Sequence, residues 1–210
     1  MTHRKRRFVA GLLFLAVALA PVVAVSGPLE EGRGAFERGD YAAALRLLGP
    51  LAERGNAEAQ SRLGVMYAAG RGVPQDYVAA VKWYRLAAEQ GNAKAQHNLG
   101  VMYDKGRGVR RDLAEALKWY RLAADQGDAV ARHGLGVMYA EGRGVAREFD
   151  AALKWYRLAA GQGNADAQRD LGAMYDKGQG VPRDTVEAVK WYRLAAKQGN
   201  ASAQLTLGAG

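Results

Sequence analysis

The sequence predicts an all-α fold, an α/α solenoid (superhelix) built from tandem 36-residue helix-turn-helix units. Two residue pairs recur at this spacing. Leu63-Gly64 returns at positions 99, 135, 171 and 207, and Trp83-Tyr84 returns at positions 119, 155 and 191. A fixed period of about 20–50 residues is the sequence signature of a repeat architecture. We therefore predict units at residues 57–92, 93–128, 129–164 and 165–200, with no insertion between them.

Each unit is expected to form two helices, and the first of them, helix A, covers about residues 57–69 in the first unit. Leu63 and its apolar neighbours recur at the spacing of one helical face. Asn56 precedes the helix as an N-cap, and Asn or Asp holds the same place in each later unit. A Gly-x-Gly segment begins at Gly70 and should end helix A, because glycine accepts the positive φ of a helix C-terminus.

Helix B of the first unit is expected to start after the cap Asp76 and to run to about Gln90. Trp83 and Tyr84 lie on its apolar stripe. Stacking of sugars or bases is an alternative role for these aromatic pairs, but their helical spacing favours a place in the core. In the third unit Glu148 replaces the aspartate and should be a weaker cap.

The segments that flank the four units depart from the pattern. Residues 27–56 are predicted to be a divergent first unit with a shorter loop between its helices. Gly49 and Pro50 fall inside its second helix, which we expect them to bend or break. Residues 201–210 form part of a fifth unit, where Ala203, Leu205 and Leu207 should either cap the preceding unit or pair with another chain.

Residues 1–26 are predicted to be a secretory signal peptide. Four basic residues at positions 4–7 precede an apolar run from Phe8 to Val25, and Ala24 and Ser26 supply the small residues of a cleavage site. Cleavage after Ser26 would release a periplasmic or secreted protein. The alternative is an uncleaved anchor, which is the only membrane attachment that we expect.

Composition excludes several classes of function. The 210 residues include no cysteine, which rules out disulfides, thiolate metal sites and cysteine nucleophiles. The formal net charge is +9, of which the cations at positions 4–7 contribute four, so +5 remains for residues 27–210. This charge is too small to favour a nucleic-acid partner, and we expect none.

The repeated positions carry a family resemblance. In the first complete unit the repeated residues are Ala57, Ala59, Leu63, Gly64, Tyr67, Gly70, Gly72, Val73, Asp76, Ala80, Trp83, Tyr84, Ala87, Ala88 and Gly91. This pattern resembles the Sel1-like repeat family, a relative of the tetratricopeptide repeats. The resemblance implies an α/α superhelix that acts as an adaptor, and several bacterial members look like envelope proteins that regulate or assemble larger complexes. Some cysteine-rich relatives carry a disulfide in each repeat and have been linked to β-lactam binding. This chain has none of those cysteines, so we do not expect that activity here.

No catalytic constellation is evident, and we predict that the chain is not an enzyme and needs no cofactor. His97 and His133 occupy equivalent positions one unit apart, where two imidazoles could share a metal ion. No acidic third ligand recurs beside them, so we expect exposed polar side chains on helix A and no metal site.

Basic residues recur on helix B and in the loops, and stacked units would align them into ladders. We expect these ladders to be a solvated outer face whose long side chains cover apolar surface. The alternative function is binding of an anionic glycan or cell-wall polymer. The ladders comprise Lys82, Lys118, Lys154 and Lys190; Arg85, Arg121, Arg157 and Arg193; and Arg71, Arg107 and Arg143.

The positions that change from unit to unit predict the binding surface. If helix A lines the concave side, as in tetratricopeptide arrays, its outward residues vary in sign and size while the core repeats. We therefore predict an exported, non-enzymatic scaffold that binds a protein or peptide through this face. The candidate partner-binding residues are Glu58, Ser61, Lys94, His97, Asp104, Lys105, His133, Glu141, Asp166, Arg169, Asp176 and Lys177.

Overall fold

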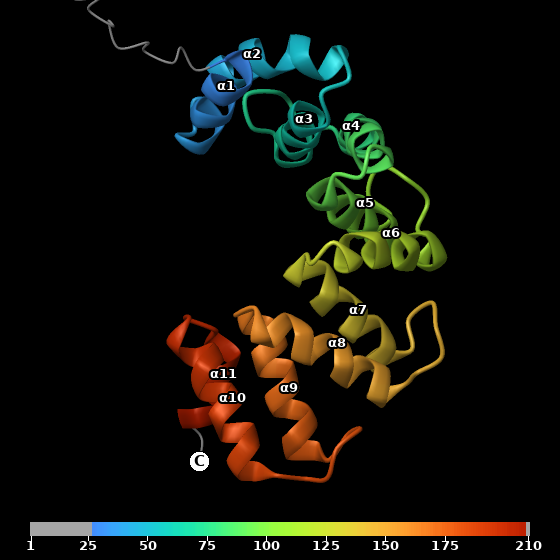
Figure 1. Ribbon diagram of the computed structural model, residues 1–210, viewed down its shortest axis with the longest axis vertical. Coiled ribbons are helices and arrows are strands. Elements are labelled where there is room, and N and C mark those ends of the chain that lie inside the picture. The colour runs from blue at the N-terminus through green and yellow to red at the C-terminus, as the bar shows by residue number, and fades with distance from the viewer. Residues whose placement is uncertain (1–26, 209–210) are drawn as a thin grey trace, which may run out of the picture.

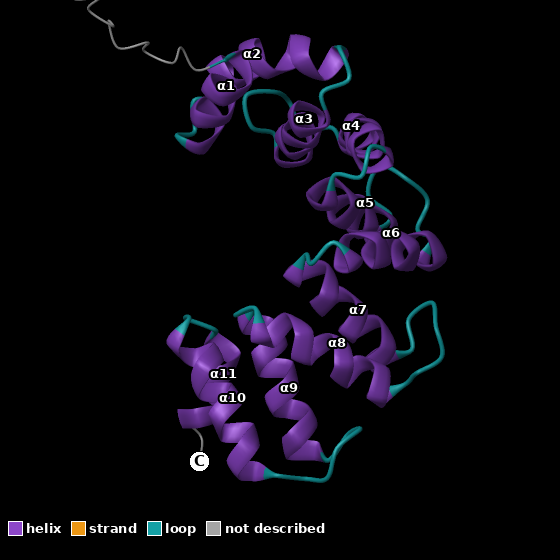
Figure 2. Cartoon of the chain, viewed as in Figure 1, coloured by secondary structure: helices purple, strands orange, loops and turns teal. Residues whose placement is uncertain are grey.

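A computed structural model describes residues 27–208, which form eleven α-helices and no strand (Figures 1 and 2). Odd-numbered helices are the A helices and even-numbered helices are the B helices. The predicted signal, residues 1–26, lies outside the described residues. The helices are α1 (Pro28–Glu37), α2 (Tyr41–Glu53), α3 (Ala57–Ala69), α4 (Tyr77–Glu89), α5 (Ala93–Lys105), α6 (Leu113–Asp125), α7 (Ala129–Glu141), α8 (Phe149–Gly161), α9 (Ala165–Lys177), α10 (Thr185–Lys197) and α11 (Ala201–Gly208).

The predicted caps set the ends of the helices. The Asn56 side chain accepts a hydrogen bond from the Ala59 amide at 2.9 Å, and α3 ends at Gly70, whose φ is 66°. Asp76 caps α4 in the same way, through the Val78 and Ala79 amides. Because an N-cap side chain supplies an acceptor to otherwise unpaired amides, these bonds fix where each helix begins. Glu148 makes no such bond at the start of α8, as its weaker capping ability predicts.

The first helix pair differs from the others as the sequence indicates, with one exception. Only residues 38–40 separate α1 from α2, whereas seven residues separate α3 from α4. Of the two effects predicted for Gly49 and Pro50, a bend or a break in the second helix, the break is wrong, because α2 continues through Pro50 to Glu53. Pro50 and Arg46, four residues before it, are both exposed, so water can satisfy the Arg46 carbonyl that loses its helical partner.

Successive helices pack antiparallel and build a curved array (Figure 1). Each helix contacts the helices before and after it in the chain, and in addition α3 contacts α5 and α7 contacts α9. Helices on the inner side of a curved stack lie closest together. These direct contacts therefore place the A helices on the inner, concave side, as predicted for a tetratricopeptide-like array.

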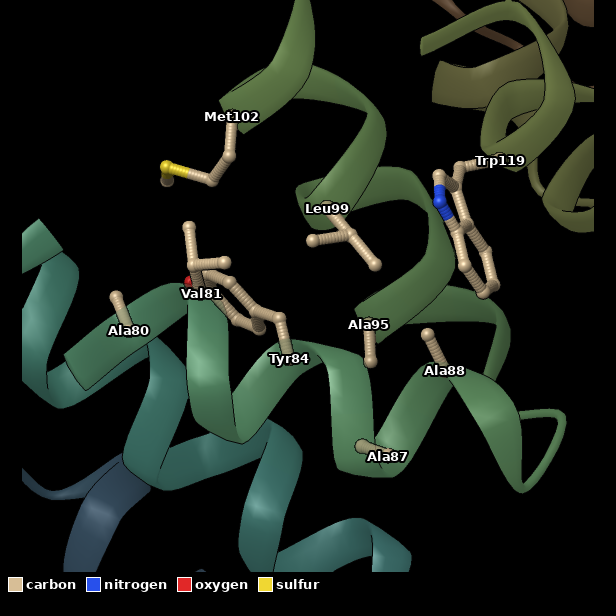
Figure 3. Packing of buried hydrophobic residues seen from close by; sticks show 9 residues of the cluster. All are labelled: Ala80, Val81, Tyr84, Ala87, Ala88, Ala95, Leu99, Met102 and Trp119. Carbon is tan, nitrogen blue, oxygen red and sulfur yellow. The ribbon is translucent and has the colours of Figure 1, made fainter. Parts of the chain in front are cut away.

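The core lies between successive helices and repeats with them. Figure 3 shows one segment of it, in which Tyr84 of α4 packs against Leu99 and Met102 of α5. The glycine of the Leu-Gly pair lets the repeated tyrosine of helix B approach helix A closely. Gly100 and Tyr120, the equivalent of Tyr84 in the next unit, are one example. A Cβ atom at Gly100 would lie 2.8 Å from a ring carbon of Tyr120, which is closer than two carbon atoms can pack. The recurrent glycine is therefore a packing residue of helix A.

Hydrogen bonds between polar side chains also connect the units. These bonds are not predicted from the repeat pattern of the sequence. Gln60 is buried on α3, where its amide donates to the Ala52 carbonyl at 3.0 Å and accepts from Gln90 at 2.7 Å. Gln96 and Gln168 make the same pair of bonds in later units. Each glutamine thus satisfies a carbonyl near the end of the preceding helix, which would otherwise be buried without a partner.

The last described helix, α11, covers the end of the array only in part. Ala203 is buried and Leu207 packs on the same cluster, whereas 74% of Leu205 is exposed. None of the helices within residues 27–208 is long and apolar enough to cross a membrane.

Candidate functional site

The twelve candidate residues on the A helices differ widely in exposure. Five are exposed, namely Lys94, Lys105, Glu141, Asp166 and Lys177, and six are half-buried, namely Glu58, His97, Asp104, His133, Arg169 and Asp176. The expectation that Ser61 points outward is wrong, because only 6% of this residue is exposed. Ser61 nevertheless lines a groove on this face.

That concavity, which we call the N-terminal groove, has a volume of about 810 Å³ and is lined by α1, α3, α5 and the two loops next to them. Glu58, Ser61 and Lys94 from the candidate set lie along it. Arg62 lies in its wall, where its guanidinium bonds Glu58 at 2.9 Å and stacks over the Phe36 ring. Arg62 is not among the residues predicted from the sequence, because the fifth position of the unit, Ser61, is the one expected to face outward, and Arg62 is the sixth.

A second concavity, the C-terminal groove, lies between α7 and α9 and has a volume of about 440 Å³. Glu141, Arg169 and Lys177 from the candidate set line it, together with Arg147. Arg169 bonds Asp170 at 2.8 Å, yet its Nε atom is buried and has no hydrogen-bond partner among the described residues.

His97 of α5 and His133 of α7 are half-buried and are not the exposed side chains that the sequence predicts. His97 stacks on Tyr120 with ring centroids 5.9 Å apart, and His133 lies 5.7 Å from Tyr156. Burial lowers the pKa of His97 below its ordinary value, and the nearby charge of Asp128 opposes that shift. A buried imidazole that loses its hydration favours the neutral form.

His133 has an acidic partner that the sequence did not reveal. Its Nε2 atom lies 2.8 Å from Oδ2 of Asp170, which belongs to the next unit. The equivalent residue beside His97 is Gly134, so this pair occurs once and does not recur. Groups of three or more His, Cys, Asp or Glu side chains that could hold a metal ion are absent from the described part of the chain.

The remaining acidic candidates are engaged within the chain. Asp104 pairs with Arg143, which comes from the loop of the next unit. Asp166 accepts a hydrogen bond from the Asn200 side chain at 2.9 Å, and Asp176 lies 3.9 Å from Arg183. Lys105 and Lys177 have no ion pair among residues 27–208, which leaves them as the more accessible charges at the C-terminal ends of α5 and α9.

Six of the eight basic residues in the B-helix ladders contact aromatic neighbours, and Lys190 pairs instead with Glu187. Arg85 donates to the Tyr103 hydroxyl at 2.7 Å, and Arg157 donates to the Tyr175 hydroxyl at 2.8 Å. Arg121 makes the same bond to Tyr139 in the unit between them. Lys82, Lys118 and Lys154 lie over the adjacent tryptophan rings, with Nζ 5.1–5.9 Å from the ring centroids. These ladders therefore connect successive helices and cover aromatic surface, as cation–π and hydrogen-bond geometry allows.

Paired helices that stack along a curve, with grooves on the inner face, define an α/α solenoid of the repeat-protein class. The Sel1 repeat family matches residues 27–56, 57–92, 93–128, 129–164 and 165–200. The chain therefore belongs to the Sel1 repeat family, whose members generally mediate protein–protein interaction and are typically non-enzymatic scaffolds.

Solved structures of this family are similar to the chain. A Sel1 repeat protein from Oxalobacter formigenes shares 40% identity with a TM-score of 0.81, over 87% of this chain and 72% of that one. A protective antigen present in uropathogenic Escherichia coli strains, which displays an SLR fold, shares 41% identity with a TM-score of 0.74, over 80% of this chain and 36% of its own length. An immunity protein from Pseudomonas aeruginosa shares 26% identity with a TM-score of 0.56, over 81% of this chain and 68% of that one. No curated protein matches the sequence.

Proposed function

We propose that the chain is an exported scaffold that holds a segment of a partner protein on its concave A-helix face and thereby regulates or assembles an envelope complex. The observation that carries this proposal is the pair of grooves on that face. Both are lined in part by A-helix side chains that change from unit to unit, whereas most of the core repeats. A scaffold that carries one specific surface on a repeated frame has this distribution of constant and variable positions.

The anionic glycan alternative has less support from the B helices than their charge alone suggests. Three arginines there donate to tyrosine hydroxyls, and three lysines cover tryptophan rings. These contacts give the ladders a structural role that needs no ligand. Binding of a polysaccharide to the ladders would depend strongly on salt, because exposed charges are screened over about 8 Å at physiological ionic strength. It would also weaken when Lys118 and Arg121 are neutralised together.

Charge reversal on the concave face tests the proposed function. Lys105→Glu and Lys177→Glu introduce negative charge at exposed positions of α5 and α9, and Lys197→Glu makes the same change at the end of outer helix α10. We expect a pull-down from periplasmic extract to recover a specific protein partner. The two concave variants should lose that partner and Lys197→Glu should retain it. An unchanged partner after both concave reversals would contradict the assignment to this face.

Export is a separate part of the proposal and depends on residues 1–26. A reporter enzyme that is active only outside the cytoplasm, fused after Gly210, should be active when this segment is present and inactive when it is deleted. N-terminal sequencing of the exported chain should then begin at Gly27. A reporter that stays inactive with the segment present would refute export, and a start at Met1 would show an uncleaved anchor.

A further inference from the structure

The N-terminal groove holds two basic side chains whose charge is not neutralised. Lys94 is exposed on α5, and Arg71 is exposed in the loop after α3, and both line the groove. Neither has an ion pair or a side-chain hydrogen bond among residues 27–208. Arg71 stacks over the Tyr41 ring at 5.6 Å, which orients its guanidinium and leaves its N–H groups free to donate.

The acidic side chains of the same groove are already paired. Arg62 lies 2.9 Å from Glu58 and 3.7 Å from Glu37, so its single charge is shared by these two carboxylates, and the lining as a whole carries four positive and two negative side chains. Arg33, the remaining cation in the wall, pairs with Glu30 on its own helix. The charge that the groove presents to a ligand is therefore positive, and it is concentrated at Lys94 and Arg71.

An independent observation comes from the floor of the groove. Ser61 is only 6% exposed as a residue and lines the groove, and its hydroxyl makes no hydrogen bond among residues 27–208 but stays accessible to solvent. This hydroxyl has no partner within the protein to give up, so it can donate to or accept from a chain that enters the groove. Val65 and Phe36 lie beside it and supply apolar surface.

We propose that the N-terminal groove recognises an extended acidic segment of the partner protein. Lys94 and Arg71 would bind carboxylates of that segment, the Ser61 hydroxyl would bond its main chain, and Val65 would contact an apolar side chain between the acids. The walls come from three successive A helices, which suits an extended chain that crosses them. This inference rests on the proposed function and adds the chemistry of the partner.

Two degenerate libraries of fluorescein-labelled decapeptides test the proposal. The first contains Asp, Glu, Leu and Ser, and the second replaces the acids with Asn and Gln. The purified chain should retain the acidic library in preference to the amide library. Because a charge-assisted hydrogen bond contributes enough for about a tenfold change in affinity, Arg71→Gln and Lys94→Gln should each weaken binding about tenfold. Ser61→Ala should weaken it less, and Lys177→Gln, in the other groove, should leave it unchanged.

Several outcomes would overturn the inference without touching the proposed function. One is equal retention of both libraries, and another is loss of acidic peptides in Lys177→Gln but not in Arg71→Gln. Binding of heparin, but not of the acidic peptides, with loss in Arg71→Gln would replace the peptide by a polysaccharide. In each case a protein partner that is still lost in Lys177→Glu would leave the scaffold function standing, whereas a partner that ignores both grooves would remove both proposals.

Discussion

Two glycines that face the same tyrosine from different helices should respond oppositely to the same substitution. A Cβ at Gly100, in α5, would lie 2.8 Å from the Tyr120 ring, whereas a Cβ at Gly134, in α7, would lie 3.6 Å from it. The first distance is an overlap and the second is ordinary van der Waals contact. The ring cannot move away easily, because Tyr120 is buried and His97 stacks on it.

The magnitudes follow from these distances. Overpacking of a rigid core costs about 2–3 kcal/mol here, and alanine recovers about 1 kcal/mol through its higher helix propensity. We therefore expect Gly100→Ala to lower the free energy of unfolding by about 1–2 kcal/mol. Gly134→Ala should raise it by about 0.5–1 kcal/mol, because it gains helix propensity without the overlap.

Urea denaturation followed by far-ultraviolet circular dichroism measures this difference, since the transition midpoint moves with stability when the slope is unchanged. The two variants differ by about 1.5–3 kcal/mol, so in thermal unfolding they should differ by about 3–12 °C, given about 2–4 °C per kcal/mol for a chain of this size. Equal stability of the two variants, or a more stable Gly100→Ala, would refute the claim that the recurrent Leu-Gly pair exists to admit the tyrosine.

Other predictions concern the buried polar groups. Gln96→Ala should lower the free energy of unfolding in urea by about 1–3 kcal/mol, because it leaves the carbonyl of buried Ala88 without its partner, whereas Gln204→Ala at the exposed equivalent should change it by less than about 0.5 kcal/mol. Burial lowers the pKa of His97, so the unfolded chain binds this proton more readily and the free energy of unfolding should fall as the pH drops below about 6.5. His97→Phe keeps a ring on Tyr120 and should show a smaller fall. An equal fall in this variant would contradict the assignment of the effect to His97. Burial raises the pKa of Tyr84 and Tyr156, so stability should be lost as the pH rises above about 10. The phenolate absorbance of these buried tyrosines should appear only as the chain unfolds, and its appearance before unfolding would contradict their burial.

The fold was predictable because its signals are local to each unit. The cap at Asn56, the positive-φ glycine at position 70 and the apolar face around Leu63 all act within about 15 residues and recur at a constant spacing. The predicted solenoid and the helix bounds of the first full unit are confirmed. The predicted break at Pro50 does not occur, because the cost of a proline inside a helix depends on whether water reaches the carbonyl that it leaves unpaired. That exposure depends on the tertiary structure and is not visible in the sequence.

The candidate site was less predictable because it depends on how one unit rotates against the next. His133 and Asp170 are 37 residues apart, and Gln60 and Gln90 are 30 apart, so neither pair follows from periodicity within a helix. The burial of Ser61 likewise depends on its neighbouring helices in space. That the variable side chains of the A-helix face bind a partner stays a prediction. Which of those side chains remain free for a partner emerged only from their contacts.

Photo-crosslinking in cells tests the central claim, that the partner lies on the A-helix face. A photoreactive amino acid would replace Lys94 in the N-terminal groove, Lys177 in the C-terminal groove, or Leu122, which is 42% exposed on outer helix α6. We predict a discrete protein adduct, identified by mass spectrometry, from at least one groove position and none from position 122. An adduct from position 122 alone would contradict the account.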